Sequence, residues 1–570
     1  MDNVRTILTP SAIWGDFNGQ LPLKESKISE MTYDRITYTE VYFSGRETES
    51  ARVRIYGLYA RPNTLPAGKK LGAVLVLPDF YDTVDLETVN HFAKQGYAVL
   101  MVDYRGETKE TTNHTNYPSE IDYANFMGAE DVFRVDRTAK QTCWYEWSAV
   151  AKYAISYLRA RPEVDKIGIV GIKQGANVGW QALFGEDRVS CFVPMFGIGW
   201  QAYLDVPKFD GSDIEMSDER YRWLSGVDAH VYAQHVKCPV FYVAGTNSSR
   251  FSCDRGVDTL TRMPPEVESH FNFAPRLRGV INKKCADDVS LFLKKHLARD
   301  GVNTEKLYFP KQPDLMLAPG KEDGNIFAEV VASETEKIKS IAVYCSEGTA
   351  EPSKRNWCLM QPAIKEKGEI SKTIFKMALN CGSELVTAFA VVEYKNGVTL
   401  SSRIVHKKIE KKPTNVSKML YSSKNGVDGF TIYDEKKNAV GGVFFEENSG
   451  IELVHCANGI AGISSRYGLL TYKIGESRFK YDANSIIKFD VYCEEYTRLN
   501  VSLMLDDGKG EFTAYSTVVT LKGSRVWQNV QAQFSEFKSE SRMGIKDYSK
   551  IVALKIDAES RFAINNLLLI

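Results

Sequence analysis

Short apolar runs alternate with helical patterns between about residues 50 and 300. Residues 72–77, 97–103 and 166–171 are rich in Val, Leu and Ile, which is typical of strands buried on both faces of a sheet. Over residues 147–159, apolar positions recur at helical spacing. Strands that alternate with helices predict a doubly wound, mostly parallel α/β sheet. Further strands are expected at 189–195 and 239–244, a last helix at 286–297, and antiparallel leading strands within 36–59.

The helical pattern largely disappears after about residue 306. Short alternating segments at 326–331, 338–344, 374–377 and 385–392 predict a small β-sandwich. A Lys-rich stretch at 407–412, followed by Pro413, indicates a linker. Six more strands are expected at 486–492, 499–505, 512–520, 527–534, 551–556 and 563–570, enough for a jelly roll. The predicted organisation is an α/β domain at 1–305 followed by two all-β sandwich domains at 306–411 and 412–570.

The composition of the chain argues against some classes of binding partner. The chain has 570 residues, and its 72 Lys+Arg balance its 72 Asp+Glu, so the strongly basic character typical of nucleic-acid-binding domains is absent. No apolar run approaches the ~18 residues that a transmembrane helix needs, so no membrane partner is expected. The N-terminus lacks a signal-peptide pattern, which makes the cytoplasm the expected location. The sequence suggests no cofactor, and the oligomeric state stays open.

A glycine-bracketed turn follows the strand at 166–171. The segment "GIKQG" (171–175) joins this strand to a helix. Small residues at both ends of such a turn permit a sharp, strained bend that lifts the central side chain above the sheet. This is the framework of a nucleophile elbow, whose chemistry requires Ser, Cys or Asp at the centre. The chain has Lys173 there.

The segment from residue 71 to 297 resembles α/β-hydrolases of the acetyl xylan esterase and dienelactone hydrolase type. The matching stretches are "QGYAVLMVDYRG" (95–106), "CWYEW" (143–147), "YAISYLRARPEVDKIGIVGIKQG" (153–175) and "HVKCPVFYVAGTN" (235–247). The resemblance implies an α/β-hydrolase fold. In family members with intact motifs, it also implies hydrolysis of carboxyl esters by a Ser–His–Asp relay.

All three members of that relay are missing at the matching positions. Lys173 stands in place of the nucleophilic Ser, and Ser248 stands in place of the Asp. The His that precedes the last helix is replaced by Arg278 or Gly279. Because the relay needs a nucleophile, a base and a carboxylate that orients the base, the resemblance predicts a degenerate triad in a hydrolase fold.

A pocket is expected at the carboxyl edge of the sheet, where open α/β folds bind ligands. Asp79-Phe80 replaces the HG pair that opens the family's oxyanion loop, and Tyr81 follows. Lys173 and Gln174 are expected to face this loop from the elbow. An ion pair between Asp79 and Lys173 is the preferred prediction.

Three interpretations of Lys173 stay open. Its side chain is a solvated or ion-paired remnant, an amine nucleophile at a helix N-terminus, or part of an anion site with Arg278. His270 is interpreted as a strand residue rather than a displaced base. Asp254 is placed on a loop near the missing acid, where nothing in the sequence positions it.

The last segment resembles jelly-roll carbohydrate-binding modules, on "IIKFDVYCEEYTRLNVSLML" (486–505), "WQNVQAQFSEFKS" (527–539) and "FAINNLLLI" (562–570). Such modules stack sugar rings on exposed aromatic side chains. Candidates for this role are Tyr467, Tyr472, Tyr492, Tyr496 and Tyr515, each with core or edge packing as the alternative. Candidate oxygen ligands for a structural calcium ion are Asp506, Asp507, Glu511 and Asp557, with a solvated turn as the alternative. The middle segment, with Trp357, resembles Ig-like modules.

Three functions are consistent with these patterns. The first is a catalytically impaired or inactive acetyl xylan esterase-like protein that acts in glycan recognition or scaffolding, with a carbohydrate as its ligand. The second is an active carboxyl-ester hydrolase that uses non-standard catalytic residues. The third is a purely structural interaction protein with a vestigial pocket. An ester-substrate panel separates the first two, and glycan binding separates the first from the third.

Overall fold

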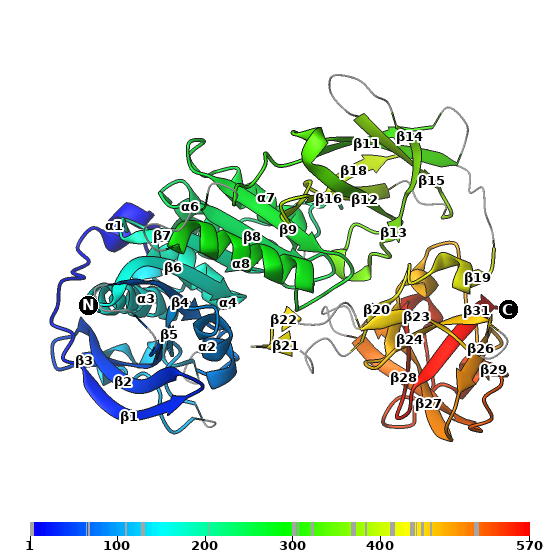
Figure 1. Cartoon of the computed structure of the whole chain (residues 1–570), viewed down its shortest axis with the longest axis horizontal. Coiled ribbons are helices and arrows are strands. Elements are labelled where there is room, and N and C mark those ends of the chain that lie inside the picture. The colour runs from blue at the N-terminus through cyan, green and yellow to red at the C-terminus, as the bar shows by residue number, and fades with distance from the viewer. Residues whose placement is uncertain are drawn as a thin grey trace.

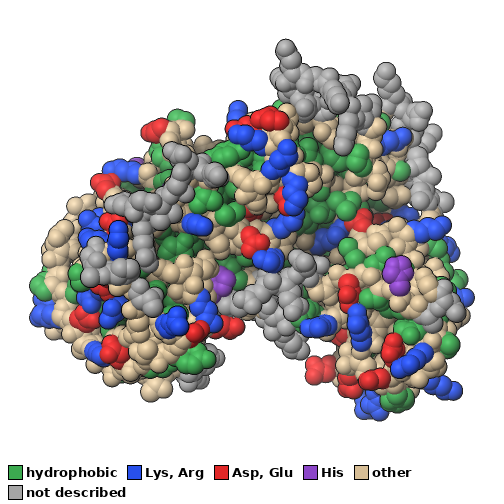
Figure 2. Space-filling view, in the orientation of Figure 1, with side chains coloured by type: hydrophobic (Ala, Val, Ile, Leu, Met, Phe, Trp, Pro, Cys, Tyr) green, Lys and Arg blue, Asp and Glu red, His purple; other side chains and the backbone are tan. Residues whose placement is uncertain are grey.

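The computed structural model shows an α/β part followed by two β-rich parts (Figure 1). It describes residues 5–63, 65, 69–108, 111–126, 132–204, 206–298, 304, 307–320, 324–365, 372–381, 385–410, 417–433, 439–440, 442–445, 450–456, 459–506 and 512–570. Within these ranges, no helix combines the length and apolarity needed to cross a bilayer. Acidic and basic side chains are intermixed over the face shown in Figure 2, in keeping with the zero net charge.

The α/β part is built on one nine-stranded sheet of order β1-β2-β3-β5-β4-β6-β7-β8-β9. The strands are β1 (Ser26–Tyr33), β2 (Ile36–Glu47), β3 (Arg52–Pro62), β4 (Leu71–Leu77), β5 (Ala98–Val102), β6 (Val164–Ile172), β7 (Val189–Met195), β8 (Val240–Gly245) and β9 (Ser269–Ala274). Strands β1, β2, β3 and β5 pair antiparallel, and the remaining pairs are parallel. The expected doubly wound sheet with antiparallel leading strands is present.

Helices cover both faces of this sheet. They are α1 (Pro10–Trp14), α2 (Leu86–Ala93), α3 (Cys143–Arg159), α4 (Gln174–Ala182), α5 (Asp218–Gly226), α6 (Ala229–Ala233), α7 (Cys253–Leu260) and α8 (Lys283–Leu297). On β6, a Cβ at Gly168 would contact Leu293 and Leu297 of α8, whereas one at Gly171 would contact Ala176 of α4. Because side chains alternate along a strand, this odd separation places α4 and α8 on opposite faces.

Helix α3 and strand β1 depart from the prediction for identifiable reasons. Helix α3 begins at Cys143, four residues before the predicted start, because Thr142 caps it by accepting a hydrogen bond from the Tyr145 N–H. Strand β1 was not predicted, because all of its residues are exposed and it has no buried face to pattern its sequence.

Residues 314–408 form two antiparallel sheets. The strands are β10 (Asp314–Pro319), β11 (Asn325–Val331), β12 (Ile338–Glu347), β13 (Cys358–Leu359), β14 (Gln361–Lys365), β15 (Lys372–Ala378), β16 (Leu385–Tyr394), β17 (Thr399–Ser401) and β18 (Val405–Lys408). One sheet has the order β10-β11-β15-β14, and the other has the order β13-β12-β16-β17 with β18 also paired to β16. Alternating burial along β11 gives it one buried face, as the period-2 pattern predicts.

The C-terminal part holds two larger antiparallel sheets and a small hairpin. The strands are β19 (Met419–Tyr421), β20 (Thr431–Ile432), β21 (Ala439–Val440), β22 (Phe444–Phe445), β23 (Ile451–His455), β24 (Ala461–Ser465), β25 (Leu469–Thr471), β26 (Ile486–Cys493), β27 (Thr497–Asp506), β28 (Phe512–Leu521), β29 (Gln528–Gln533), β30 (Ile551–Ala558) and β31 (Phe562–Leu569). The β21–β22 hairpin contacts the α/β part, where Phe444 stacks on His91 with ring centroids 4.6 Å apart. The Ile281 N–H also donates to the Val443 carbonyl at 3.0 Å, so the two parts of the chain are docked together.

Candidate functional site

The elbow between β6 and α4 has the strained backbone that its glycines suggest. Lys173 adopts φ 51° and ψ −113°, in the left-handed half of the map that non-glycine residues rarely occupy. A Cβ at Gly175 would lie 2.1 Å from the Leu77 carbonyl oxygen, so only glycine allows α4 to approach the end of β4 this closely. The side chain of Lys173 is therefore presented at the carboxyl edge of the sheet, where a nucleophile would stand.

The expected ion pair is present at this edge. Lys173 Nζ lies 3.9 Å from Asp79 Oδ2, and both side chains are about nine-tenths buried. Burial raises the pKa of Asp79 to about 6, while the Lys173 charge opposes this rise. The separation exceeds hydrogen-bonding distance, so the pair is held by charge alone.

The Asp79 carboxylate is engaged by backbone N–H groups beside the elbow. In an α/β-hydrolase, the two oxyanion donors are the N–H of the residue after the nucleophile and an N–H from the loop that follows the strand now numbered β4. Here the Phe80 N–H donates to Asp79 Oδ1 at 2.9 Å. The Gln174 N–H, next to the elbow, also stabilises the ionised Asp79 carboxylate and lowers its pKa. Asp79 therefore interacts with backbone N–H groups at both of the sequence positions that this comparison singles out.

A cavity of about 640 Å³ opens above the elbow. Its described lining residues are Asp79, Phe80, Tyr81, Lys173, Gln174, Asn247, Ser248, Ser249, Arg250, Phe251, Arg278, Gly279, Ser353, Tyr433, Met504 and Phe512. All the positions that sequence motifs assign to the degenerate triad and to the pocket therefore face one space. The cavity is shared by all three parts of the chain, since Ser353 comes from the middle part and Tyr433 from the C-terminal part.

The loop that follows β8 is fixed by the middle part of the chain. Ser248 Oγ accepts a hydrogen bond from the Phe251 N–H at 3.1 Å, and Asn247 Nδ2 donates to the Arg355 carbonyl at 2.8 Å. The expectation that nothing positions Asp254 is wrong. Asp254 lies on α7, fully buried, and accepts two hydrogen bonds from Arg355 at 2.7 and 2.6 Å.

Arg278 connects the missing-His position to the C-terminal part. Its Nη2 donates to the Tyr433 carbonyl at 3.0 Å, and its guanidinium carbon lies 5.7 Å from the Tyr433 ring centroid. The neighbouring Arg276 donates to the Trp357 carbonyl at 2.8 Å and pairs with Asp428. Sequence reasoning missed the contribution of Tyr433, because no local pattern reports which surfaces of two domains meet.

No histidine lines the cavity among the described residues. His270 is a buried residue of β9, and its Nε2 lies 3.0 Å from Glu268 Oε1. Glu268 also accepts a hydrogen bond from Lys295 at 2.6 Å. His270 therefore belongs to a packed polar cluster away from the elbow, as its strand position suggested.

The tyrosines suggested as sugar platforms are dispersed. Tyr496 is 63% exposed, Tyr467 and Tyr515 are half-buried, and Tyr472 is buried. Tyr492 lines a separate cavity of about 640 Å³ with His455, Glu494, Glu559, Arg561 and other residues. Its ring lies 5.8 Å from that of Trp527. The structure therefore does not gather these tyrosines into one platform.

The calcium candidates divide into two pairs. Asp507 and Glu511 lie outside the described residues. Asp506 pairs with Lys354, and Asp557 pairs with Lys555 at 2.5 Å. Lysine ammonium groups thus face both described carboxylates, and the described residues contain no cluster of three potential metal ligands.

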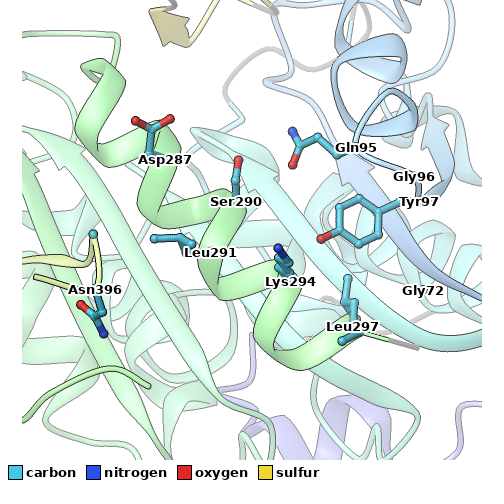
Figure 3. Close-up of a pocket in the computed structure, with 12 residues that line it drawn as sticks. Gly72, Gln95, Gly96, Tyr97, Asp287, Ser290, Leu291, Lys294, Leu297 and Asn396 are labelled. Carbon is cyan, nitrogen blue, oxygen red and sulfur yellow. The ribbon is translucent and has the colours of Figure 1, made fainter. Parts of the chain in front are cut away.

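Another cavity, of about 730 Å³, lies at the opposite edge of the sheet (Figure 3). It is bounded by Ser290, Lys294 and Leu297 of α8, by the turn that carries Gln95 and Tyr97, and by other residues. Tyr97 precedes β5 and Gly72 is the second residue of β4, so this space faces the amino ends of the parallel strands. Ligands of open α/β sheets bind at the carboxyl ends, which favours the elbow cavity as the functional site.

The comparison with family models decides the fold of the first part. Residues 57–262 match the dienelactone hydrolase family. The matched segment contains the elbow and the parallel core of the sheet, and it identifies this part as an α/β-hydrolase fold. The comparison with curated proteins gave no match.

Solved structures of esterases align with about half of the chain. The acetyl xylan esterase from Paenibacillus sp. R4 shares 15% identity, with 50% of this chain and 92% of that chain covered and a TM-score of 0.40. Acetyl xylan esterase 1 from Thermoanaerobacterium sp. JW/SL YS485 shares 16%, with 49% and 90% covered and a TM-score of 0.36. The putative dienelactone hydrolase from Klebsiella pneumoniae subsp. pneumoniae MGH 78578 shares 14%, with 46% and 98% covered and a TM-score of 0.31.

Proposed function

We propose that this protein binds a carbohydrate ligand in the elbow cavity and does not hydrolyse esters. The observation that carries the proposal is the position of Asp79, whose carboxylate takes up the two N–H groups that an oxyanion needs. A tetrahedral oxyanion entering this space would meet a negative charge instead of two donors. Repulsion there would raise the barrier to acyl transfer rather than lower it.

The rest of the relay supports the same conclusion. Acyl transfer by a hydroxyl needs a base that accepts its proton. Ser248 already accepts a hydrogen bond from the Phe251 N–H, and no imidazole lies among the described cavity residues. Asp254, the nearest carboxylate that follows the family's acid position, is fully engaged by Arg355. No described group is placed to activate a hydroxyl.

Glycan recognition is supported by the walls of the cavity and by the β-rich half. The described lining combines aromatic and polar residues, namely Tyr81, Phe251, Tyr433 and Phe512 with Ser248 and Ser249. Such a mixed lining suits a sugar ring, which has apolar C–H faces and polar edges. We infer that residues 306–411 are an Ig-like module and residues 412–570 a carbohydrate-binding jelly roll that closes the cavity.

Hydrolysis of an aryl acetate tests the loss of catalysis. We expect no hydrolysis above background for the wild-type chain or for Lys173→Ser, because the serine would still lack a base and would face a filled oxyanion hole. The double variant Lys173→Ser/Asp79→Gly, which empties the hole, is the matched control and is expected to gain at most weak activity. Hydrolysis by the wild-type chain would favour the alternative of an esterase with non-standard residues. Hydrolysis by the Lys173→Ser variant alone would overturn the role given to Asp79.

A further inference from the structure

We propose that the elbow cavity selects an acidic sugar, and that Lys173 binds the carboxylate of a uronic-acid-type unit. The inference rests on the proposed function, since it takes the cavity as a carbohydrate site without hydrolysis. It adds the chemical class of the ligand and the residue that recognises it.

The charge of the lining favours an anion. Lys173, Arg250 and Arg278 contribute three cationic groups, and Asp79 is the single carboxylate among the described lining residues. This carboxylate is turned toward the backbone N–H groups of Phe80 and Gln174. The described lining residues therefore carry an excess of positive charge, and low-dielectric walls make the attraction of an anion stronger than in water.

The ammonium of Lys173 has unused hydrogen-bonding capacity. It carries three N–H donors, and its residue is 8% exposed. The Asp79 oxygen at 3.9 Å is too distant to accept a hydrogen bond, and no other acceptor for Nζ is found in the described part of the chain. Because a buried charged group is costly without hydrogen-bond partners, this ammonium is suited to receive an anionic acceptor from a ligand.

Arg278 and Tyr433 place a second cation and a ring on the facing wall. The Tyr433 carbonyl holds Arg278 Nη2 at 3.0 Å, so the guanidinium is oriented by a contact between two domains. The Arg278 guanidinium adds positive potential to the cavity, while the hydrogen bonds to the ligand carboxylate come from Lys173.

The size and mixed character of the cavity favour a sugar acid over a small inorganic anion. Its volume of about 640 Å³ falls within the range typical of organic ligands. The described lining also includes the apolar and aromatic residues Phe251, Tyr433, Met504 and Phe512, together with the polar residue Ser249. Sulfate or phosphate would use the cations but none of this apolar surface.

Calorimetric titration of the full chain tests the proposal, with an oligogalacturonate as the acidic probe and its fully methyl-esterified form as the neutral one. We expect the acid to bind at least tenfold more tightly than the ester at low salt. Lys173→Met should lower the affinity for the acid at least tenfold and change the affinity for the ester less than twofold. Asp79→Asn, which removes a nearby negative charge, should raise the affinity for the acid and leave the affinity for the ester unchanged. Lys237→Met is the matched control, because Lys237 is exposed and pairs with Asp187 at the other edge of the sheet.

The outcomes separate this inference from the proposed function. Equal affinity for acid and ester, an unchanged affinity in Lys173→Met, or no binding of the acid would overturn the inference. If Lys173→Met does not fold, the opposite shift expected for Asp79→Asn decides in its place. Binding of neutral sugars without preference for the acid would leave the proposed function standing. Release of methanol from the ester would instead contradict the absence of hydrolysis, whatever the affinities are.

Discussion

Two buried ion pairs near the elbow cavity are built differently. Asp254 and Arg355 meet through two hydrogen bonds of 2.6 and 2.7 Å, with both side chains wholly buried. Asp79 and Lys173 stand 3.9 Å apart at the edge of a cavity. The first pair engages both oxygens of Asp254 and joins two domains. In the second pair, the N–H donors of the Lys173 ammonium are not used by Asp79.

The difference separates a structural pair from a binding pair. A closed bidentate pair repays part of its desolvation cost through hydrogen bonds, so it fixes geometry. A loose pair beside open volume keeps electrostatic attraction for a further charged group. At the carboxyl edge of the sheet, the closed pair holds the loop after β8, and the loose pair lines the cavity that we propose binds the ligand.

The largest effect should follow from opening the closed pair. Arg355→Met leaves the Asp254 charge buried without a partner, so we expect the free energy of unfolding to fall by about 3–5 kcal/mol. Urea denaturation of the full chain, followed by tryptophan fluorescence, measures this loss. The double variant Asp254→Asn/Arg355→Met removes both charges, so its free energy of unfolding should fall less than that of the single variant. Additive losses from the two single variants would contradict the coupling.

A smaller effect should follow from the pH dependence of the loose pair. Burial raises the pKa of Asp79 from 3.8 to about 6, so the folded chain binds this proton more tightly than the unfolded chain does. The associated stability is present below pH 4 and is lost as the pH rises through 6. Two pKa units correspond to about 3 kcal/mol as an upper limit.

The variant Asp79→Asn isolates this contribution. Subtracting its unfolding free energy from that of the wild type at each pH cancels other groups, including Asp103, whose pKa burial also raises to about 6. We expect the unfolding free energy of the wild type to fall relative to that of the variant as the pH rises from 4 to 6. Above pH 7 the difference should be constant. A flat difference across the whole range would mean that the pKa of Asp79 is the same in the folded and the unfolded chain.

The sequence predicts the parallel core of the sheet and the Asp79–Lys173 pair, because both depend on local patterns. Apolar runs mark buried strands, and residues that follow adjacent parallel strands meet at one edge. Local patterns do not predict the part of the cavity wall that comes from the C-terminal domain. Tyr433 lies 260 residues from Lys173 in the chain, and its place depends on how whole domains dock. Asp254 was misplaced for the same reason, since its partner Arg355 belongs to another domain.

The smallest effect concerns the backbone of the elbow itself. Lys173 holds a positive φ of 51°, a conformation that costs a non-glycine residue about 1 kcal/mol or more. We expect Lys173→Gly to be more stable than Lys173→Ala by about 1 kcal/mol, because both variants lack the ammonium and only glycine relieves the strain.

The neighbouring position provides the control for this comparison. Gln174 begins α4, where glycine is a poorer helix former, so Gln174→Ala should exceed Gln174→Gly in stability. Equal melting temperatures for the two Lys173 variants would show that the elbow relaxes when the side chain is removed. A stabilised Lys173→Gly that no longer prefers the acidic probe would divide the elbow into two separable parts. The backbone of Lys173 would then account for the strain at the turn, and its side chain would account for the preference for the acidic ligand.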